Sequence, residues 1–135
     1  MQLAEQHHQR SKMRKFLTSL LPMIVLVGFA SAASARMFAG AYNVSGTNPT
    51  GATYDGTAVI SFSRHGLCLM HGVIDSMRFR THCLRRRHYL IASYMRGGRF
   101  VHVVYERASD GSLKGTFSIA RSRGSGHEVL TPEGQ

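Results

Sequence analysis

The sequence predicts an all-β protein of about eight short antiparallel strands in a meander, which closes into a small barrel and follows an N-terminal signal helix. Three observations support this prediction. From residue 36 onward apolar and polar residues alternate, and no helical period appears. Turn-forming residues separate the alternating segments at short intervals, as in barrels and sandwiches. The barrel is preferred to a sandwich because closure removes exposed strand edges.

The first 35 residues have the three-part layout of a secretory signal peptide. Two cations precede an apolar run at 16–30, which ends in small residues. Two cleavage frames compete, one ending at Ala32 and the other at Ala35. We prefer cleavage after Ala35 because the alternating pattern begins directly behind it. The predicted organisation is therefore a signal peptide at 1–35 and a single antiparallel β domain at 36–135.

Two alternatives for the leader stay open. Translation starting at Met13 would remove twelve residues that lengthen the leader unusually. A retained membrane helix is the other alternative, although the apolar run is short and contains Pro22 and Gly28. With cleavage, the protein is expected to be periplasmic or secreted, without a stable transmembrane anchor.

The charge of the β domain is strongly positive. Residues 36–135 contain thirteen Lys and Arg and six Asp and Glu, a net charge of +7, and Lys114 is the only lysine among these cations. A basic exported domain is expected to bind polyanions or an anionic envelope surface. Nucleic acid is a less favoured partner, because few aromatic residues are available to stack on bases. The alternative is a charge that only keeps the protein soluble.

The alternating segments define the predicted strands. A long connection at 46–56 separates the first two, since Pro49 lacks a backbone donor and three glycines permit unusual backbone angles. The eight strands are predicted at 38–45, 56–64, 66–74, 77–84, 88–95, 99–107, 112–120 and 126–131.

The hairpin between the sixth and seventh predicted strands has the best-defined register. A three-residue loop at 109–111, with Gly111 in a left-handed bulge, sets apolar residues opposite one another. The expected pairs are Val101 with Ile119, Val103 with Phe117 and Tyr105 with Gly115. His102, Glu106, Lys114 and Thr116 then lie on the solvated face.

The two ends of the β domain resemble a known group of proteins. The start, GAYNVSGTNPTGATYDG, and the end, GSGHEVLTP, are similar to small exported all-β proteins, mostly from proteobacteria, which are usually described as hypothetical and sometimes as fibronectin-binding. This resemblance implies export and an extracellular-matrix protein as a possible partner, and it implies no catalytic residues. The middle of the chain, GLCLMHGVIDSMRFRTHCLRRRH, departs from that group, and the sequence has no Trp.

Cys68 and Cys83 are the only cysteines, and export favours their pairing in a disulfide. If Asp75 and Ser76 form the centre of the turn between them, the two cysteines lie directly opposite each other on adjacent strands. The same register puts His71 and His82 on the other face of the hairpin. A four-ligand zinc site is therefore not expected. A weak two-histidine metal site is the alternative, and no cofactor is expected.

Arginine is concentrated in the middle of the chain. Its planar guanidinium binds phosphate, sulfate and carboxylate groups through paired hydrogen bonds, so an arginine-rich edge is the predicted anion-binding surface. Three arginines lie in a predicted turn and four in or beside neighbouring strands. These candidates are Arg85, Arg86 and Arg87, followed by Arg78, Arg80, Arg96 and Arg99.

No catalytic motif or cofactor loop is present in the sequence, so no enzyme activity is predicted. The favoured function is an exported binding or envelope-associated module that contacts an anionic partner through the arginine-rich edge. The alternative is a barrel that carries a small apolar ligand, with a cavity behind Phe100 and the Val101, Val103 and Tyr105 face, or that inhibits another enzyme through its loops. A hydrolase is the least favoured hypothesis.

Overall fold

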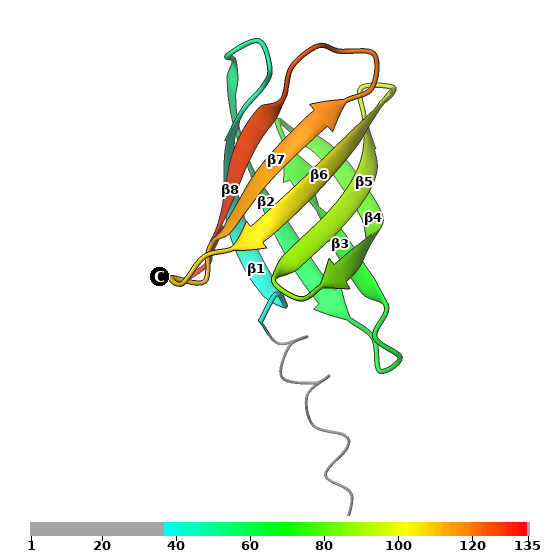
Figure 1. Ribbon diagram of the computed structural model, residues 1–135, viewed down its shortest axis with the longest axis vertical. Helices are drawn as coiled ribbons and strands as arrows, with labels where there is room; N and C mark the ends of the chain where they lie inside the picture. The colour runs from blue at the N-terminus through cyan, green and yellow to red at the C-terminus, as the bar shows by residue number, and fades with distance from the viewer. Residues whose placement is uncertain (1–36, 135) are drawn as a thin grey trace, which may run out of the picture.

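The computed structural model describes residues 37–134, which form eight antiparallel strands joined in sequence order. Each strand pairs with the next, and the last pairs with the first, so the meander closes into a barrel (Figure 1). The predicted fold class is thereby confirmed. The strands are β1 (Gly40–Thr47), β2 (Thr53–Phe62), β3 (Cys68–Ile74), β4 (Met77–Arg86), β5 (Tyr89–Arg96), β6 (Arg99–Arg107), β7 (Leu113–Ile119) and β8 (Gly126–Pro132).

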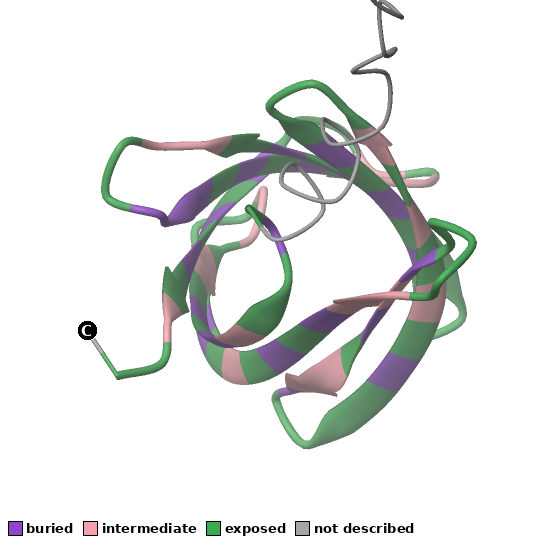
Figure 2. Ribbon diagram, turned by 90° about the horizontal axis from the view of Figure 1, so that it is seen from below, coloured by how far each residue is buried: buried purple, intermediate pink, exposed green. Residues whose placement is uncertain are grey.

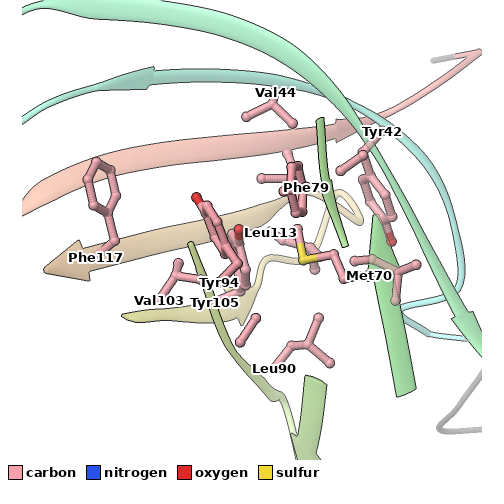
Figure 3. Close-up of a cluster of buried hydrophobic side chains, with 14 of the residues drawn as sticks. Tyr42, Val44, Met70, Phe79, Leu90, Tyr94, Val103, Tyr105, Leu113 and Phe117 are labelled. Atoms are coloured by element: carbon pink, nitrogen blue, oxygen red, sulfur yellow. The ribbon is translucent and has the colours of Figure 1, made fainter. Parts of the chain in front are cut away.

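Alternate side chains of each strand point into the barrel, as the pleat of a β-strand requires. Buried and exposed residues therefore alternate along the strands around the ring (Figure 2). An eight-stranded barrel has an interior that side chains can fill. Aromatic and aliphatic side chains fill most of it (Figure 3), and Phe38 just before β1, Leu90, Val103, Leu113 and Leu130 are completely buried.

The connections gather at two ends of the barrel. The upper end in Figure 1 carries the β1–β2 loop, the β3–β4 and β5–β6 turns and the long β7–β8 loop. The lower end carries the remaining connections and both ends of the described chain. At the lower end the hydroxyl of Tyr42 donates a hydrogen bond to the carbonyl of Phe38 at 2.8 Å, and Arg107 Nε donates to the carbonyl of Met37 at 2.8 Å. These bonds hold the segment before β1 against the barrel.

The two hairpins with a predicted register have that register. Val101 pairs with Ile119, Val103 with Phe117 and Tyr105 with Gly115, and Gly111 has a φ of 87° in the loop. In the β3–β4 hairpin, Asp75 and Ser76 form the two-residue turn with φ values of 46° and 67°. Positive φ at both central residues is the geometry that matches the twist of the flanking strands.

The first two strands are longer at the upper end than predicted. β1 continues to Thr47, which pairs with Thr53, so the predicted connection at 46–56 shrinks to five residues. The turn at Asn48 closes through two backbone hydrogen bonds, Asn48 N–H to the Ala52 carbonyl and Gly51 N–H to the Asn48 carbonyl, both at 2.8 Å. The prediction assigned the glycines of this segment to a connection. Gly46 and Gly56 instead lie within the strands.

These strand glycines make room for large interior side chains. A Cβ on Gly46 would lie 2.3 Å from the Tyr54 ring, and one on Gly126 would lie 2.1 Å from the Phe117 ring. Gly115 similarly faces the Tyr105 ring, at 2.8 Å. In each of these pairs, a large aromatic side chain on one strand lies over a glycine on the neighbouring strand, and the missing side chain of the glycine leaves room for the ring.

Cys68 and Cys83 form the predicted disulfide across β3 and β4. Both residues lie on the inward side of the hairpin, whereas His71 and His82 are exposed on the outer wall. The two cysteines are 15 residues apart in the sequence, so the bridge closes a loop of that length. A loop of this length is expected to contribute about 3 kcal/mol, chiefly by restricting the unfolded chain.

Within residues 37–134, no helix is long and apolar enough to span a membrane. The predicted signal peptide at 1–35 and both cleavage frames lie outside the described residues.

We predict that Gly126→Ala destabilises the barrel by about 1–3 kcal/mol, because the added methyl group must displace the buried Phe117 ring. Urea unfolding measures this change. Ser118→Thr is the matched control, since it adds one methyl group to an exposed position of β7. Equal stability of the two variants would contradict the tight packing of Phe117 against β8.

We predict that the Cys68→Ala, Cys83→Ala double variant loses about 2–4 kcal/mol of unfolding free energy in non-reducing buffer. The reference protein should lose a similar amount when reductant is added, whereas the variant should not respond. Before reduction, the intact mass of the reference protein should lie two hydrogens below the mass calculated from its sequence, whereas the mass of the variant should equal the calculated value. A reductant effect of equal size in both proteins would contradict the prediction.

Candidate anion-binding site

A buried carboxylate lies inside the barrel toward its upper part. Glu128 on β8 is 2% exposed and accepts hydrogen bonds from two tyrosine hydroxyls. Tyr54 of β2 donates to Oε2 at 2.5 Å, and Tyr105 of β6 donates to Oε1. A buried carboxylate without such donors would be strongly destabilising. The three side chains therefore bind β2, β6 and β8 together through the interior of the barrel.

Burial keeps these tyrosines protonated. Burial first, and the negative charge of Glu128 second, raise the pKa of Tyr54, Tyr94 and Tyr105 above the usual value of about 10. A protonated phenol is the form that can donate to the carboxylate. The cluster is accordingly arranged to accept and hold one negative charge, that of Glu128.

Arg96 connects this interior cluster to the upper end of the barrel. Its guanidinium carbon lies 4.5 Å from the centre of the Tyr54 ring, in a cation–π arrangement. Its Nη2 donates to Asp75 Oδ2 in the β3–β4 turn at 2.9 Å, and its side chain is only 14% exposed. Arg96 therefore joins the ends of β5, β2 and the β3–β4 turn.

An open cavity of about 480 Å³, which we call the mouth cavity, lies at the upper end. Three arginines line it: Arg96 at the end of β5, Arg99 at the start of β6 and Arg123 in the β7–β8 loop. Val101 and Ile119, which pair across β6 and β7, form an apolar part of its lining. Among residues 37–134, no carboxylate lines the cavity. It therefore has the size of a small-molecule site and a positive charge.

The arginines of the mouth cavity differ in how they are held. Arg96 is paired with Asp75, and Arg99 Nη1 donates to Ser122 Oγ at 3.1 Å. Arg99 and Arg123 are both exposed. A cation that is already positioned by a neutral hydroxyl loses little entropy when it binds an anion, so Arg99 is well prepared to take a carboxylate, sulfate or phosphate.

The seven arginines predicted as one edge lie in three separate places. Arg96 and Arg99 are at the mouth cavity, whereas Arg86 and Arg87 are at the β4–β5 connection of the lower end. Arg85 is on the inward side of β4 near that end, and Arg78 and Arg80 are exposed on the outer wall. A closed barrel has no single edge on which the seven could meet.

A second cationic surface is present on the outer wall of β2, β3 and β4. His71, Arg78 and Arg80 surround a shallow hollow of about 670 Å³ over Gly72. The nearby His82 pairs with Leu69, two positions along the ladder from the pair of His71 with Arg80. Within the described residues, no group of three or more His, Cys, Asp or Glu could hold a metal ion. A two-histidine site at His71 and His82 stays a prediction.

The side chains that could serve as nucleophiles for hydrolysis include the two cysteines and a serine beside a histidine. Both cysteines of the described chain are in the disulfide, so neither provides a thiolate. Ser93 Oγ lies 2.8 Å from His102 Nδ1, but the pair is exposed on the outer wall. Neither residue lines the mouth cavity or the outer-wall hollow. The absence of enzyme activity stays a prediction.

The cavity expected behind Phe100 lies elsewhere. Phe100 is 55% exposed on the outer wall, and the Val103 and Tyr105 positions face an interior filled by side chains. Val101, at the upper end of this face, borders the mouth cavity.

Sequence reasoning missed Glu128, its tyrosine partners and Arg123. Glu128 is two residues from Leu130 on β8, so both side chains lie on the inward face of the strand. In the sequence alone, however, a single carboxylate in a short strand looks like a solvent-exposed residue. Arg123 lies in the run ARSRGSG, whose small residues indicate only a loop. Neither signal tells which residues from other strands lie nearby.

No family model matches this chain, and no curated protein sequence matches it. The resemblance to small exported β proteins therefore stays a prediction.

We predict that the tyrosines of the folded protein resist ionisation. Because the folded pKa of Tyr54, Tyr94 and Tyr105 lies above the unfolded value, their contribution to stability is complete below about pH 10 and is lost as the pH rises further. Tyrosinate absorbance should therefore rise at higher pH in the folded protein than in denaturant, together with the loss of β-sheet signal. Superimposable titration curves would contradict this prediction.

Proposed function

We propose that this protein is an exported, non-enzymatic binding module that takes an anionic group at the mouth cavity. The observation that supports the proposal is the convergence of three arginines on one open cavity: Arg96 and Arg99 flank the β5–β6 turn, Arg123 lies in the β7–β8 loop, and none of the described residues that line the cavity is a carboxylate. Asp75 neutralises only one of the three guanidinium groups. The site therefore keeps a surplus of positive charge for a carboxylate, sulfate or phosphate.

Export of this module rests on the leader. Residues 1–35 have the layout of a signal peptide, and a disulfide like that between Cys68 and Cys83 persists in oxidising compartments. A mature protein whose intact mass corresponds to Arg36 as its first residue would support this part of the proposal.

The binding test compares charge reversal at the two ends of the barrel. Arg99→Glu with Arg123→Glu changes the upper end, and Arg86→Glu with Arg87→Glu makes the same net change in charge at the lower end. We expect the upper-end variant to bind heparin fragments and phosphatidylglycerol vesicles at least about tenfold more weakly than the lower-end variant at low salt. Equal losses in both variants would indicate non-specific attraction by net charge and would contradict the proposed site.

The outer-wall hollow is a second candidate surface for a polyanion, because Arg78, Arg80 and His71 border it. Arg78→Glu with Arg80→Glu makes the same change in charge as the two variants above. A loss of binding in this variant alone would show that the anion binds on the wall of β2, β3 and β4 and would contradict binding at the mouth cavity.

A further inference from the structure

The barrel wall is incompletely paired between β4 and β5. Their ladder includes only Cys83–Arg86 with Tyr89–Ala92, although both strands continue toward the upper end. Above the ladder, Thr81 Oγ1 donates a hydrogen bond to the carbonyl of Ser93 at 2.5 Å, where a backbone donor of a continued ladder would lie. The two strands therefore separate as they approach the β3–β4 and β5–β6 turns.

A cavity of about 260 Å³, which we call the slot, occupies this separation. Five apolar or aromatic residues, two arginines and a glycine line it: Ile74, Met77, Phe79, Tyr94 and Met95, then Arg78 and Arg96, and Gly97. The rings of Phe79 and Tyr94 are stacked with their centres 4.8 Å apart, which gives the slot a flat apolar wall. The stacked rings, together with Ile74, Met77 and Met95, form a wall against which a hydrocarbon chain can pack out of water.

The slot adjoins the mouth cavity. Met77, Arg96 and Gly97 line both, so the apolar slot meets the cationic site at these three residues. Gly97 has no side chain to separate them, and a Cβ built on it would contact nothing within 4 Å. An apolar cavity and a cationic cavity are thereby placed side by side.

We propose that the mouth cavity and the slot together bind a single-chain anionic amphiphile, with its head group at Arg99 and Arg123 and its apolar tail along Met77 and Phe79. This inference rests on the proposed function, since the mouth cavity supplies the anion site, and it names the class of ligand. A purely apolar ligand would leave the arginines unused, and a small inorganic anion would leave the slot unfilled. An extended peptide added to the open strands is less favoured, because Thr81 already occupies the carbonyl of Ser93.

The first experiment uses the unmodified mature protein and a series of carboxylates: butanoate, hexanoate, octanoate and decanoate, each below its micelle concentration. Calorimetric titration should show affinity that rises about threefold to fourfold for each methylene group that enters the slot, and then levels off. Decyltrimethylammonium and decanol, which have the same tail without a negative charge, should bind at least about tenfold more weakly than decanoate.

A matched pair of variants locates the tail. Met77→Gln should weaken decanoate binding at least about threefold more than it weakens butanoate binding, because only the longer tail reaches the slot, whereas butanoate can contact Met77 only where it borders the mouth cavity. Leu84→Gln is the control, since Leu84 is also exposed on β4 and lines neither cavity. Aromatic NMR signals of Phe79 and Tyr94 should shift with decanoate but not with butanoate.

Three results would overturn the inference. Affinity that depends on Arg99 and Arg123 but not on tail length would be consistent with the proposed function and would contradict an amphiphile as the ligand. Equal binding of decanoate and decyltrimethylammonium would remove the role of the head group. If an acidic peptide displaced decanoate and bound more tightly, the slot would instead be a site where an extended peptide pairs with the barrel strands. A protein that binds no carboxylate, heparin fragment or anionic vesicle would lose the proposed function itself.

Discussion

The pairing of β1 with β8 is the constraint on which the rest of this structure depends. Once the last strand pairs with the first, eight strands set the barrel width, and the interior must be filled by the side chains that point inward. Tyrosines and phenylalanines supply that volume, and glycines on neighbouring strands give them space. The buried Glu128 is tolerated for the same reason, because closure brings two tyrosine hydroxyls from distant strands to its two oxygens.

Arg96 joins the stable interior to the candidate binding site. Its contact with the Tyr54 ring ties it to the hydrogen-bonded cluster around Glu128, and its ion pair with Asp75 orders the β3–β4 turn beside the mouth cavity. Binding sites need side chains held by the surrounding structure, since a mobile group loses more entropy on binding. Arg96 is held in this way, and the hydrogen bond to Ser122 Oγ also positions the exposed Arg99.

Local sequence predicted the elements that depend on local physics. Alternation and turn chemistry were sufficient for the register of β6 with β7 and of β3 with β4, and thus for the disulfide between Cys68 and Cys83. The prediction was wrong at the β1–β2 loop. Gly46 was interpreted as a turn residue, but it lies in β1, where its lack of a side chain leaves room for the Tyr54 ring. It also gathered seven arginines on one edge, since neighbours in sequence were assumed to be neighbours on the surface.

The sequence by itself determined an all-β meander with one disulfide and a strongly basic domain, because alternation, turns and composition are properties of adjacent residues. Only the tertiary structure decided which charges meet. Tyr54 and Glu128 are 74 residues apart, and Arg123 of the β7–β8 loop lines the same cavity as Arg96 and Arg99, which flank the β5–β6 turn. Closure and the tilt of the strands bring them together, and no local pattern records that convergence.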